Sequence, residues 1–171
     1  YAQVSMKSAY LRAHYPAEFI AAVVSNQGGY YSAFAYLSEG RRMGLTILLP
    51  DINASDWAYV GSGKTVLVGL MQITSLQVDF ATRIVTERQT NGLYRSLSDF
   101  LDRVRPEIAQ TTLLIKAGCF DSIAGELTRP ALLWRLFASQ ATKPPGYQPV
   151  PPEYARPQQL AHELALFGFP L

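Results

Sequence analysis

The chain has 171 residues, of which 49% are hydrophobic, and this is enough to bury a core in one compact domain or two small ones. Neither a membrane span nor a secretory leader is expected, because no stretch approaches the roughly 18 consecutive apolar residues of a membrane helix and the start is not basic and then apolar. The net charge of +2 is too small to indicate nucleic-acid binding by itself, and the excess of arginine, eleven of fifteen basic residues, suits phosphate contacts and a GC-rich coding bias equally.

The cysteine and histidine content limits the chemistry of the chain. Cys119 is the single cysteine, which excludes a disulfide within the chain and a Cys-rich zinc site. Only His14 and His162 add imidazole ligands. We therefore expect a reducing, cytoplasmic setting, and no metal or other cofactor held by this segment.

The first part of the chain predicts three short helices. Apolar residues from Val4 to His14 form the first, which Pro16 ends. Pro16 begins the second, whose apolar run stops before Gly28-Gly29. The third extends from Ser32 to Met43, with Phe34, Leu37 and Met43 on one side and Gly44 as its stop.

A small sheet is predicted next. β-branched and apolar residues fill Leu45 to Leu49, Trp57 to Val60 and Thr65 to Leu70. The last two runs flank Gly61-Ser62-Gly63-Lys64, a four-residue turn of the kind that closes hairpins.

Helical patterns return after residue 77. We expect helices over 78–88, 96–104 (capped by Ser96 and Asp99), 106–117 and 131–138, the last with Leu132, Leu133, Leu136 and Phe137 buried. Six prolines among residues 143–157 predict a stiff linker, followed by an amphipathic segment that ends at Gly168. The fold class is therefore mainly α with a small β-sheet (α+β).

Several motifs occur in a fixed order along residues 1–123. They are Ala9 to Phe19, Gly40 to Leu45, Pro50 to Ser55, Gly69-Leu70, Ile84 to Arg88, Asn91-Gly92, Ser96 to Phe100 and Leu114 to Ser122, with Leu166 to Leu171 as a further match. Together they resemble the alpha subunit of bacterial DNA polymerase III, a C-family DNA polymerase. The resemblance implies the C-terminal part of the fingers over 1–50, a β connector over 51–70, and a tandem helix-hairpin-helix domain over 71–123. A trailing helix over 124–142, the linker over 143–157 and the start of a following segment over 158–171 complete the expected organisation.

The first hairpin departs from the family pattern. In such a hairpin, glycines let the turn approach a DNA backbone, and the next helix offers its N-terminal amides to a phosphate. Here the family's Lys-Gly-Val-Gly is replaced by Thr74-Ser75-Leu76-Gln77, and the basic residues before the second helix pair are replaced by Ala109-Gln110-Thr111. These changes weaken the expected phosphate contact and favour a divergent or error-prone paralogue. The candidate DNA-binding residues are Thr74, Ser75, Leu76, Gln77, Arg83 and Arg88, with Lys7, Arg12 and Arg41 in the fingers.

The resemblance implies no catalytic residue in this chain. In this family, the carboxylates that hold two Mg²⁺ ions lie in the palm, upstream of the part of the polymerase that this chain resembles from Tyr1 onwards. Asp99 and Asp102 share a helix, but Arg103 and Arg105 beside them indicate a solvated charged face. The parent is thus expected to be a Mg²⁺-dependent DNA-directed DNA polymerase, and this segment a noncatalytic part that holds DNA in replication or translesion synthesis.

Two other functions stay open, together with further partners. The domain is alternatively a structural spacer or protein-interaction platform without DNA affinity, whereas an independent hydrolase or transferase has no nucleophile–base pair to support it. Duplex primer-template DNA is the expected partner, and the full-length parent is expected to meet the sliding clamp and other replisome subunits. Gln159-Leu160 begins like a clamp-binding peptide but continues with Ala161-His162, so the chain predicts no clamp site.

Overall fold

The fold is mainly helical, as predicted. The computed structural model describes residues 1–27, 29–140, 146 and 150–171. Within these ranges lie eight α-helices, two short 3-10 helices and three short strands. In chain order they are α1 (Ala2–His14), α2 (Pro16–Ser25), α3 (Ala33–Arg42), β1 (Thr46–Leu48), β2 (Val60–Ser62), β3 (Thr65–Leu67), η1 (Leu70–Gln72), α4 (Val78–Asn91), α5 (Leu97–Val104), α6 (Ile108–Lys116), η2 (Asp121–Ile123), α7 (Arg129–Ala138) and α8 (Arg156–Phe167).

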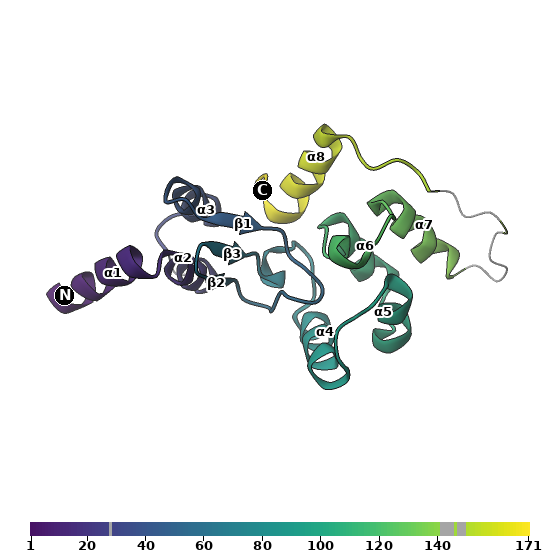
Figure 1. Cartoon of the computed structure of the whole chain (residues 1–171), viewed down its shortest axis with the longest axis horizontal. Helices are drawn as coiled ribbons and strands as arrows, with labels where there is room; N and C mark the ends of the chain where they lie inside the picture. Colours follow the sequence, from purple (N-terminus) through teal and green to yellow (C-terminus); the bar gives the residue numbers. More distant parts are fainter. Residues whose placement is uncertain (28, 141–145, 147–149) are drawn as a thin grey trace.

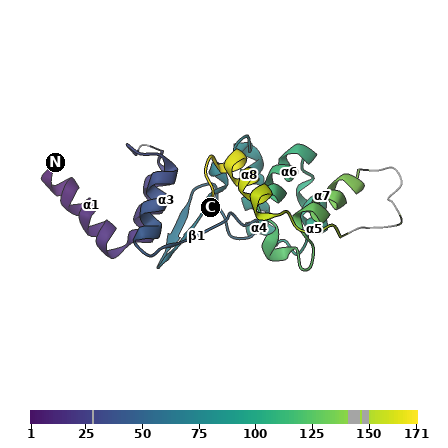
Figure 2. The ribbon, with the colours of Figure 1, turned by 90° about the horizontal axis from the view of Figure 1, so that it is seen from above.

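The molecule is elongated, with α1 at one end and α5 and α7 toward the other (Figures 1 and 2). The sheet lies between these two ends, and α8 returns so that the C-terminus lies near β1. One continuous core extends from Ala17 on α2 to Phe169 after α8. The described residues of α1 contribute no buried side chain to this core.

The sheet has the order β1-β3-β2. Strand β1 pairs with β3 in parallel, and β2 pairs with β3 as an antiparallel hairpin in which Gly61 lies opposite Val66. The hairpin turn is therefore shorter than predicted, because Gly61 and Ser62 belong to β2. Gly63, with φ of +59°, is the residue that needs glycine's conformational freedom in the turn.

Close packing of α2 on β2 explains the position of Gly61. A Cβ atom at Gly61 would lie 2.2 Å from the carbonyl oxygen of Ala17, so only glycine lets the strand approach α2 this closely. The predicted strand from Trp57 to Val60 is correspondingly displaced. Asp56 and Trp57 instead accept hydrogen bonds from the amides of Leu70 and Met71, which ties this segment to η1.

The motif from Pro50 to Ser55 joins the sheet to the helices that follow. Asp51 accepts a hydrogen bond from the amide of Asn53 at 2.7 Å, and Ser55 donates its hydroxyl to the carbonyl of Val68 at 2.8 Å. Asn53 in turn donates to and accepts from the backbone of Tyr94, both at 2.8 Å. The loop therefore fixes the position of α4 and α5 relative to the sheet.

An aromatic cluster lies among α4, α5 and the segment that follows α6. The ring of Phe100 on α5 lies 5.1 Å from the rings of both Tyr94 and Phe120, in edge-to-face geometry. Leu132 and Leu136 of α7 are buried, as predicted. Phe137 is 55% exposed, and the prediction that it is buried is wrong, because its position on the helix lies beyond the stripe that packs against α6.

The C-terminal helix begins earlier than predicted. Arg156 and Pro157 lie inside the first turn of α8, where proline needs no amide partner, rather than in the expected linker. Residues 141–145 and 147–149 of that predicted linker lie outside the described residues. Gly168 ends α8 with φ of +81°, as its position in the sequence indicated. Leu166, Phe167 and Phe169 are buried against the rest of the chain, so this segment belongs to the same core.

Candidate nucleic-acid interface

The first hairpin comprises η1, residues 73–77 and α4. Ser75 adopts a φ of +66°, the left-handed region that favours glycine, whereas Gln77 has an ordinary φ of −76°. Of the two glycines that the hairpin pattern contains, only the one replaced by Ser75 is therefore required by this backbone. Leu76 is buried, whereas Thr74, Ser75 and Gln77 are exposed at the loop surface.

The side chain of Gln110 on α6 closes this hairpin from the inside. Its amide oxygen accepts a hydrogen bond from the backbone amide of Gln77 at 2.9 Å, and its amide nitrogen donates to the carbonyl of Ser75 at 3.1 Å. Gln110 is 8% exposed. The amide at Gln77, one of the groups that a phosphate would contact in such a hairpin, is thus already paired within the protein.

The last turn of α8 lies on the other side of the same hairpin. The carbonyl of Leu166 accepts hydrogen bonds from both the amide and the hydroxyl of Thr74, each at 2.8 Å. The carbonyl of Phe167 accepts a third, from the side-chain amide of Gln72, at 2.7 Å. The hairpin therefore donates to the unpaired carbonyls that end α8.

The second hairpin joins α5 to α6 through Arg105, Pro106 and Glu107. Arg105 is exposed and adopts a φ of +48°. Arg83 on α4 donates to the carbonyl of Val104, so the guanidinium of Arg83 lies beside the turn that contains Arg105. Glu107 occupies the N-cap position of α6. Among the described residues, however, no side chain accepts a hydrogen bond from the first amides of this helix. Arg83 and Arg105 are thus the two arginines at the turn that precedes the N-terminus of α6, whose first amides have no partner within the helix.

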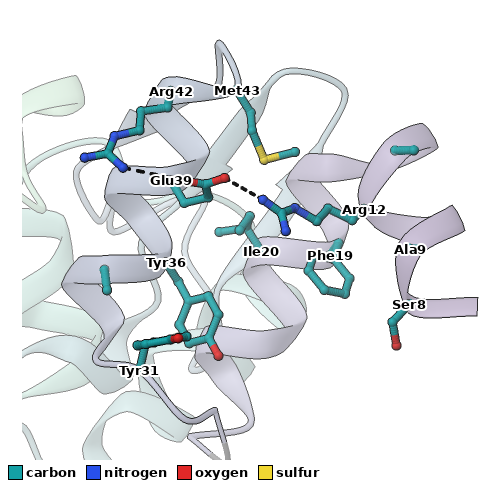
Figure 3. A pocket seen from close by; sticks show the side chains of 12 residues that line it. Ser8, Ala9, Arg12, Phe19, Ile20, Tyr31, Tyr36, Glu39, Arg42 and Met43 are labelled. Atoms are coloured by element: carbon teal, nitrogen blue, oxygen red, sulfur yellow. Dashed lines mark hydrogen bonds and ion pairs between the residues drawn. The ribbon is translucent and has the colours of Figure 1, made fainter. Parts of the chain in front are cut away.

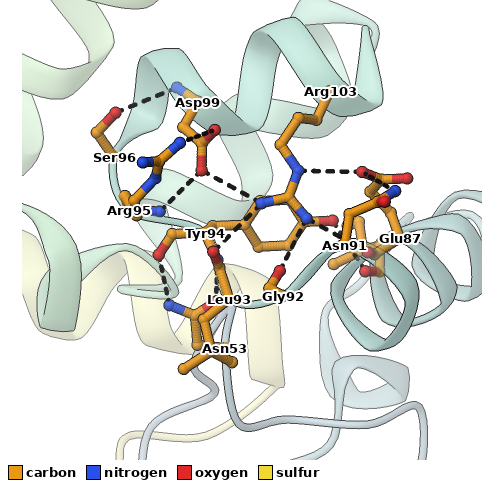
Figure 4. A network of polar contacts seen from close by, with 11 residues as sticks. Asn53, Glu87, Asn91, Gly92, Leu93, Tyr94, Arg95, Ser96, Asp99 and Arg103 are labelled. Atoms are coloured by element: carbon orange, nitrogen blue, oxygen red, sulfur yellow. Dashed lines mark hydrogen bonds and ion pairs between the residues drawn. The ribbon is translucent and has the colours of Figure 1, made fainter.

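Arg103 organises a polar network between α4 and α5 (Figure 4). It donates to Glu87 at 3.0 Å, to Asp99 at 3.2 Å and to the carbonyl of Gly92 at 2.8 Å, and it stacks 4.5 Å above the ring of Tyr94. The hydrogen bond from Arg103 lowers the pKa of Glu87. The pKa of Asp99 is lowered first by the backbone amide of Arg95 and then by Arg103. Burial raises the pKa of Tyr94 to about 12. Arg103 is committed to these partners within the protein.

Arg88, a predicted DNA-binding residue, lies in the interior. It is 9% exposed, and its guanidinium donates to the carbonyls of Ile52 and Ser55 at 3.0 Å and to Asp56 at 2.8 Å. Arg88 was predicted to contact DNA, but its guanidinium instead holds the loop after β1 against α4. The DNA contacts that we propose below do not include Arg88.

The predicted contacts of the fingers lie far from the hairpins, around α1 and α3 (Figures 1 and 3). Lys7 and Arg41 are exposed. Arg12 pairs with Glu39 of α3, and Arg42 approaches the same carboxylate at 3.9 Å. Arg12, Glu39 and Arg42 border a cavity of about 920 Å³ between α1, α2 and α3. The structure does not bring Lys7, Arg12 and Arg41 together with the hairpin residues.

Metal ligation has no structural basis in the described part of the chain, where no group of three or more His, Cys, Asp or Glu side chains converges. Cys119 is fully buried, and burial raises the pKa of its thiol. None of the helices in the described ranges has the length and apolar character needed to span a bilayer.

Sequence reasoning did not identify Gln110 as a determinant of the hairpin. The residue was noted only because it replaces a basic residue of the family pattern. Its role depends on a contact between Gln77 and Gln110, 33 positions apart, for which neither segment carries a local signal.

Comparisons with known proteins agree with this architecture. The sequence model of a family described as a helix-hairpin-helix motif matches residues 44–131. A DNA polymerase III subunit alpha of Saccharopolyspora erythraea is 37% identical over 127 residues, which cover 72% of this chain and 11% of that protein. One from Thermus aquaticus is 33% identical, over 78% of this chain and 12% of that protein. An error-prone DNA polymerase of Nocardia farcinica is 33% identical, over 96% of this chain and 15% of that protein.

The chain therefore belongs to the helix-hairpin-helix family. Within that class it is a segment of the family of bacterial DNA polymerase III alpha subunits and error-prone DNA polymerases. It spans between 11% and 15% of the length of these three relatives.

Proposed function

We propose that this segment is a noncatalytic DNA-binding part of a DNA-directed DNA polymerase, and that it holds duplex primer-template DNA through sequence-independent contacts to the backbone. The observation that supports the proposal lies at the turn before α6: Arg83 donates to the carbonyl of Val104, Arg105 is exposed, and among the described residues no side chain caps α6. A helix N-terminus with unpaired amides attracts a phosphate, and two guanidinium groups beside it add charge-assisted donors. Such contacts position a duplex without distinguishing its bases.

The surrounding charges set the expected strength of binding. Glu107 at the N-cap of α6 and Asp102 on α5 oppose the two arginines, while Arg88 and Arg103 are engaged inside the protein. We therefore expect weak binding through few phosphates. The logarithm of affinity should fall with the logarithm of salt concentration with a slope of roughly 2 to 4, at about 0.9 per phosphate contacted.

A second candidate function, that of a structural spacer or protein-interaction module, is favoured by the closed first hairpin. Gln110 and the end of α8 already pair with the hydrogen-bond donors of Gln72, Thr74 and Gln77. In that case the parent polymerase would bind DNA elsewhere. The two candidates differ in whether the second hairpin contacts a duplex at all.

Titration of two fluorescent duplexes of unrelated sequence with the 171-residue chain, at several salt concentrations, tests the proposal. We expect the same weak affinity for both duplexes. Replacing both Arg83 and Arg105 by alanine should lower the salt slope by about 1.8, which is two phosphate contacts at about 0.9 each. The control is Arg135→Ala, which removes an exposed arginine of α7 and should leave the slope unchanged. Absence of binding at low salt favours the spacer.

The proposal extends to the parent protein. Its nucleotidyl transfer, its Mg²⁺ ions and its contacts with the sliding clamp and other replisome subunits belong to regions beyond this segment. The segment alone should not extend a primer at any Mg²⁺ concentration, and metal-dependent incorporation by the purified chain would contradict this assignment.

A further inference from the structure

The end of α8 presents to the first hairpin the kind of group that a DNA phosphate would present. The carbonyls of the last turn of a helix have no partner within the helix, and together they carry roughly half a negative charge. In α8 two of these carbonyls, at Leu166 and Phe167, accept three hydrogen bonds from Gln72 and Thr74. A negatively polarised acceptor thus occupies the donors of the hairpin.

We propose that the end of α8 and the residues after it form an autoinhibitory strap that competes with a DNA phosphate for the first hairpin. The inference rests on the proposed function, since it concerns how the same domain regulates its contact with duplex DNA. The hydrogens that Thr74 donates to Leu166 cannot be donated to a phosphate at the same time. With the strap displaced, the donors of Thr74 and the first amides of α4, which no side chain caps in the described structure, would be available to an anion.

Three contacts hold the strap and the chain that leads into α8. Before α8, the carboxylate of Glu153 accepts a hydrogen bond from the amide of Arg129 on α7 at 2.9 Å. After α8, the strap folds back so that Glu163 accepts a hydrogen bond from the amide of Leu171 at 2.7 Å. Between these points Phe169, 6% exposed, packs 5.8 Å from the ring of Phe34 on α3.

The contact between Phe34 and Phe169 explains an exposed aromatic residue. Phe34 was expected on the same side of α3 as Leu37, yet Phe34 is 45% exposed, whereas Leu37 is buried, and Phe34 lies where the strap meets that helix. In Figure 1 the C-terminus lies close to α3 and β1, on the side of the sheet that α8 reaches. The strap therefore contacts both the first hairpin and α3, and its release would remove contacts from each of them.

Weakening the strap should raise DNA affinity, which is the opposite of what loss of a structural helix would do. We expect Phe169→Ala to bind duplex about threefold more tightly or better, because apparent affinity follows the fraction of chains whose hairpin is free. The salt slope should also rise by about 0.9 for the phosphate gained. The matched control is Leu132→Ala on α7, which also removes a buried side chain but leaves the strap in place.

Two further measurements keep the test decisive. Phe34→Ala weakens the same anchor from the half-exposed side and should also raise affinity, so it decides the matter if Phe169→Ala does not fold. In the unaltered chain, the nuclear Overhauser contact between the rings of Phe34 and Phe169 should disappear on saturation with duplex. Equal affinities of all variants, or a contact that persists in the DNA complex, overturn the strap while leaving the proposed function intact. Absence of binding by every variant overturns both.

Discussion

The side-chain amide of Gln110 accepts a hydrogen bond from the backbone amide of Gln77 at 2.9 Å, and this bond connects the two hairpins. We expect Gln110→Ala to lower the free energy of unfolding by about 1–2 kcal/mol, because a backbone amide and a carbonyl of the first hairpin lose their partner. Urea denaturation measures the change. Gln89→Ala, at an exposed position of α4, is the control and should shift stability by less than about 0.5 kcal/mol.

Glycine at position 75 should stabilise the protein. Ser75 is held at φ of +66°, and relief of this left-handed conformation should raise the free energy of unfolding by about 1 kcal/mol. Gln77→Gly is the matched variant. The φ of −76° at Gln77 suits any residue, so glycine at this position only increases the conformational freedom of the unfolded chain. This variant should therefore lower the free energy of unfolding. A gain from Gln77→Gly equal to that from Ser75→Gly would contradict the assignment.

Arg88 should matter for stability rather than for direct contact with DNA. Arg88→Ala leaves the carbonyls of Ile52 and Ser55 without a donor, and we expect a loss of about 2–4 kcal/mol in the free energy of unfolding. Arg95→Ala removes the same charge from a side chain that is 86% exposed and should be nearly neutral. Equal stability of the two variants in thermal or urea unfolding would show that the hydrogen bonds of Arg88 to Ile52 and Ser55 do not stabilise the fold.

The network of Arg103 predicts a defined dependence of stability on pH. The pKa values of Glu87 and Asp99 are lowered from 4.5 and 3.8, so both carboxylates stabilise the folded chain above those values. That contribution is lost as the pH falls through the lower pKa values of the folded state, because the unfolded chain then binds more protons.

Arg103→Met should make the decline of stability below pH 4.5 shallower, since Glu87 loses the main cause of its lowered pKa and Asp99 loses one of several. Urea midpoints measured between pH 7 and pH 3 give the slope. Arg135→Met, which removes an arginine outside the network, is expected to keep the slope of the unaltered chain. Parallel slopes for all three proteins would exclude the network as the cause.

Local signals in the sequence predicted most of the elements and much less of the contacts between them. Gly44 and Gly168 were expected helix stops, and each has a positive φ just after its helix. Such signals are local because backbone conformation depends on neighbouring residues. The displaced turn at Gly61 has another cause, the nearby backbone of α2, which no neighbour in sequence reveals.

The candidate site was the least predictable part for the same reason. The motif over residues 74–77 located the first hairpin, but its partners are on α6 and at the end of α8. The bond from Thr74 to Leu166 joins residues 92 positions apart. Arg88 was also misplaced, because its charge suggested a surface position. Its burial is explained only by the carbonyls of Ile52 and Ser55, which accept its hydrogen bonds.

The lack of buried side chains in α1 places this helix outside the cooperative folding unit of the chain. It has 13 residues, a length at which an isolated helix in water is marginal, since about 12–15 residues are needed before propagation offsets nucleation. Its last turn is tied to α3 through Arg12 and Glu39, so its helix–coil equilibrium is biased mainly from that end. As the temperature rises, α1 should therefore fray from Ala2 toward Arg12 well before the core from Ala17 to Phe169 unfolds in a single transition.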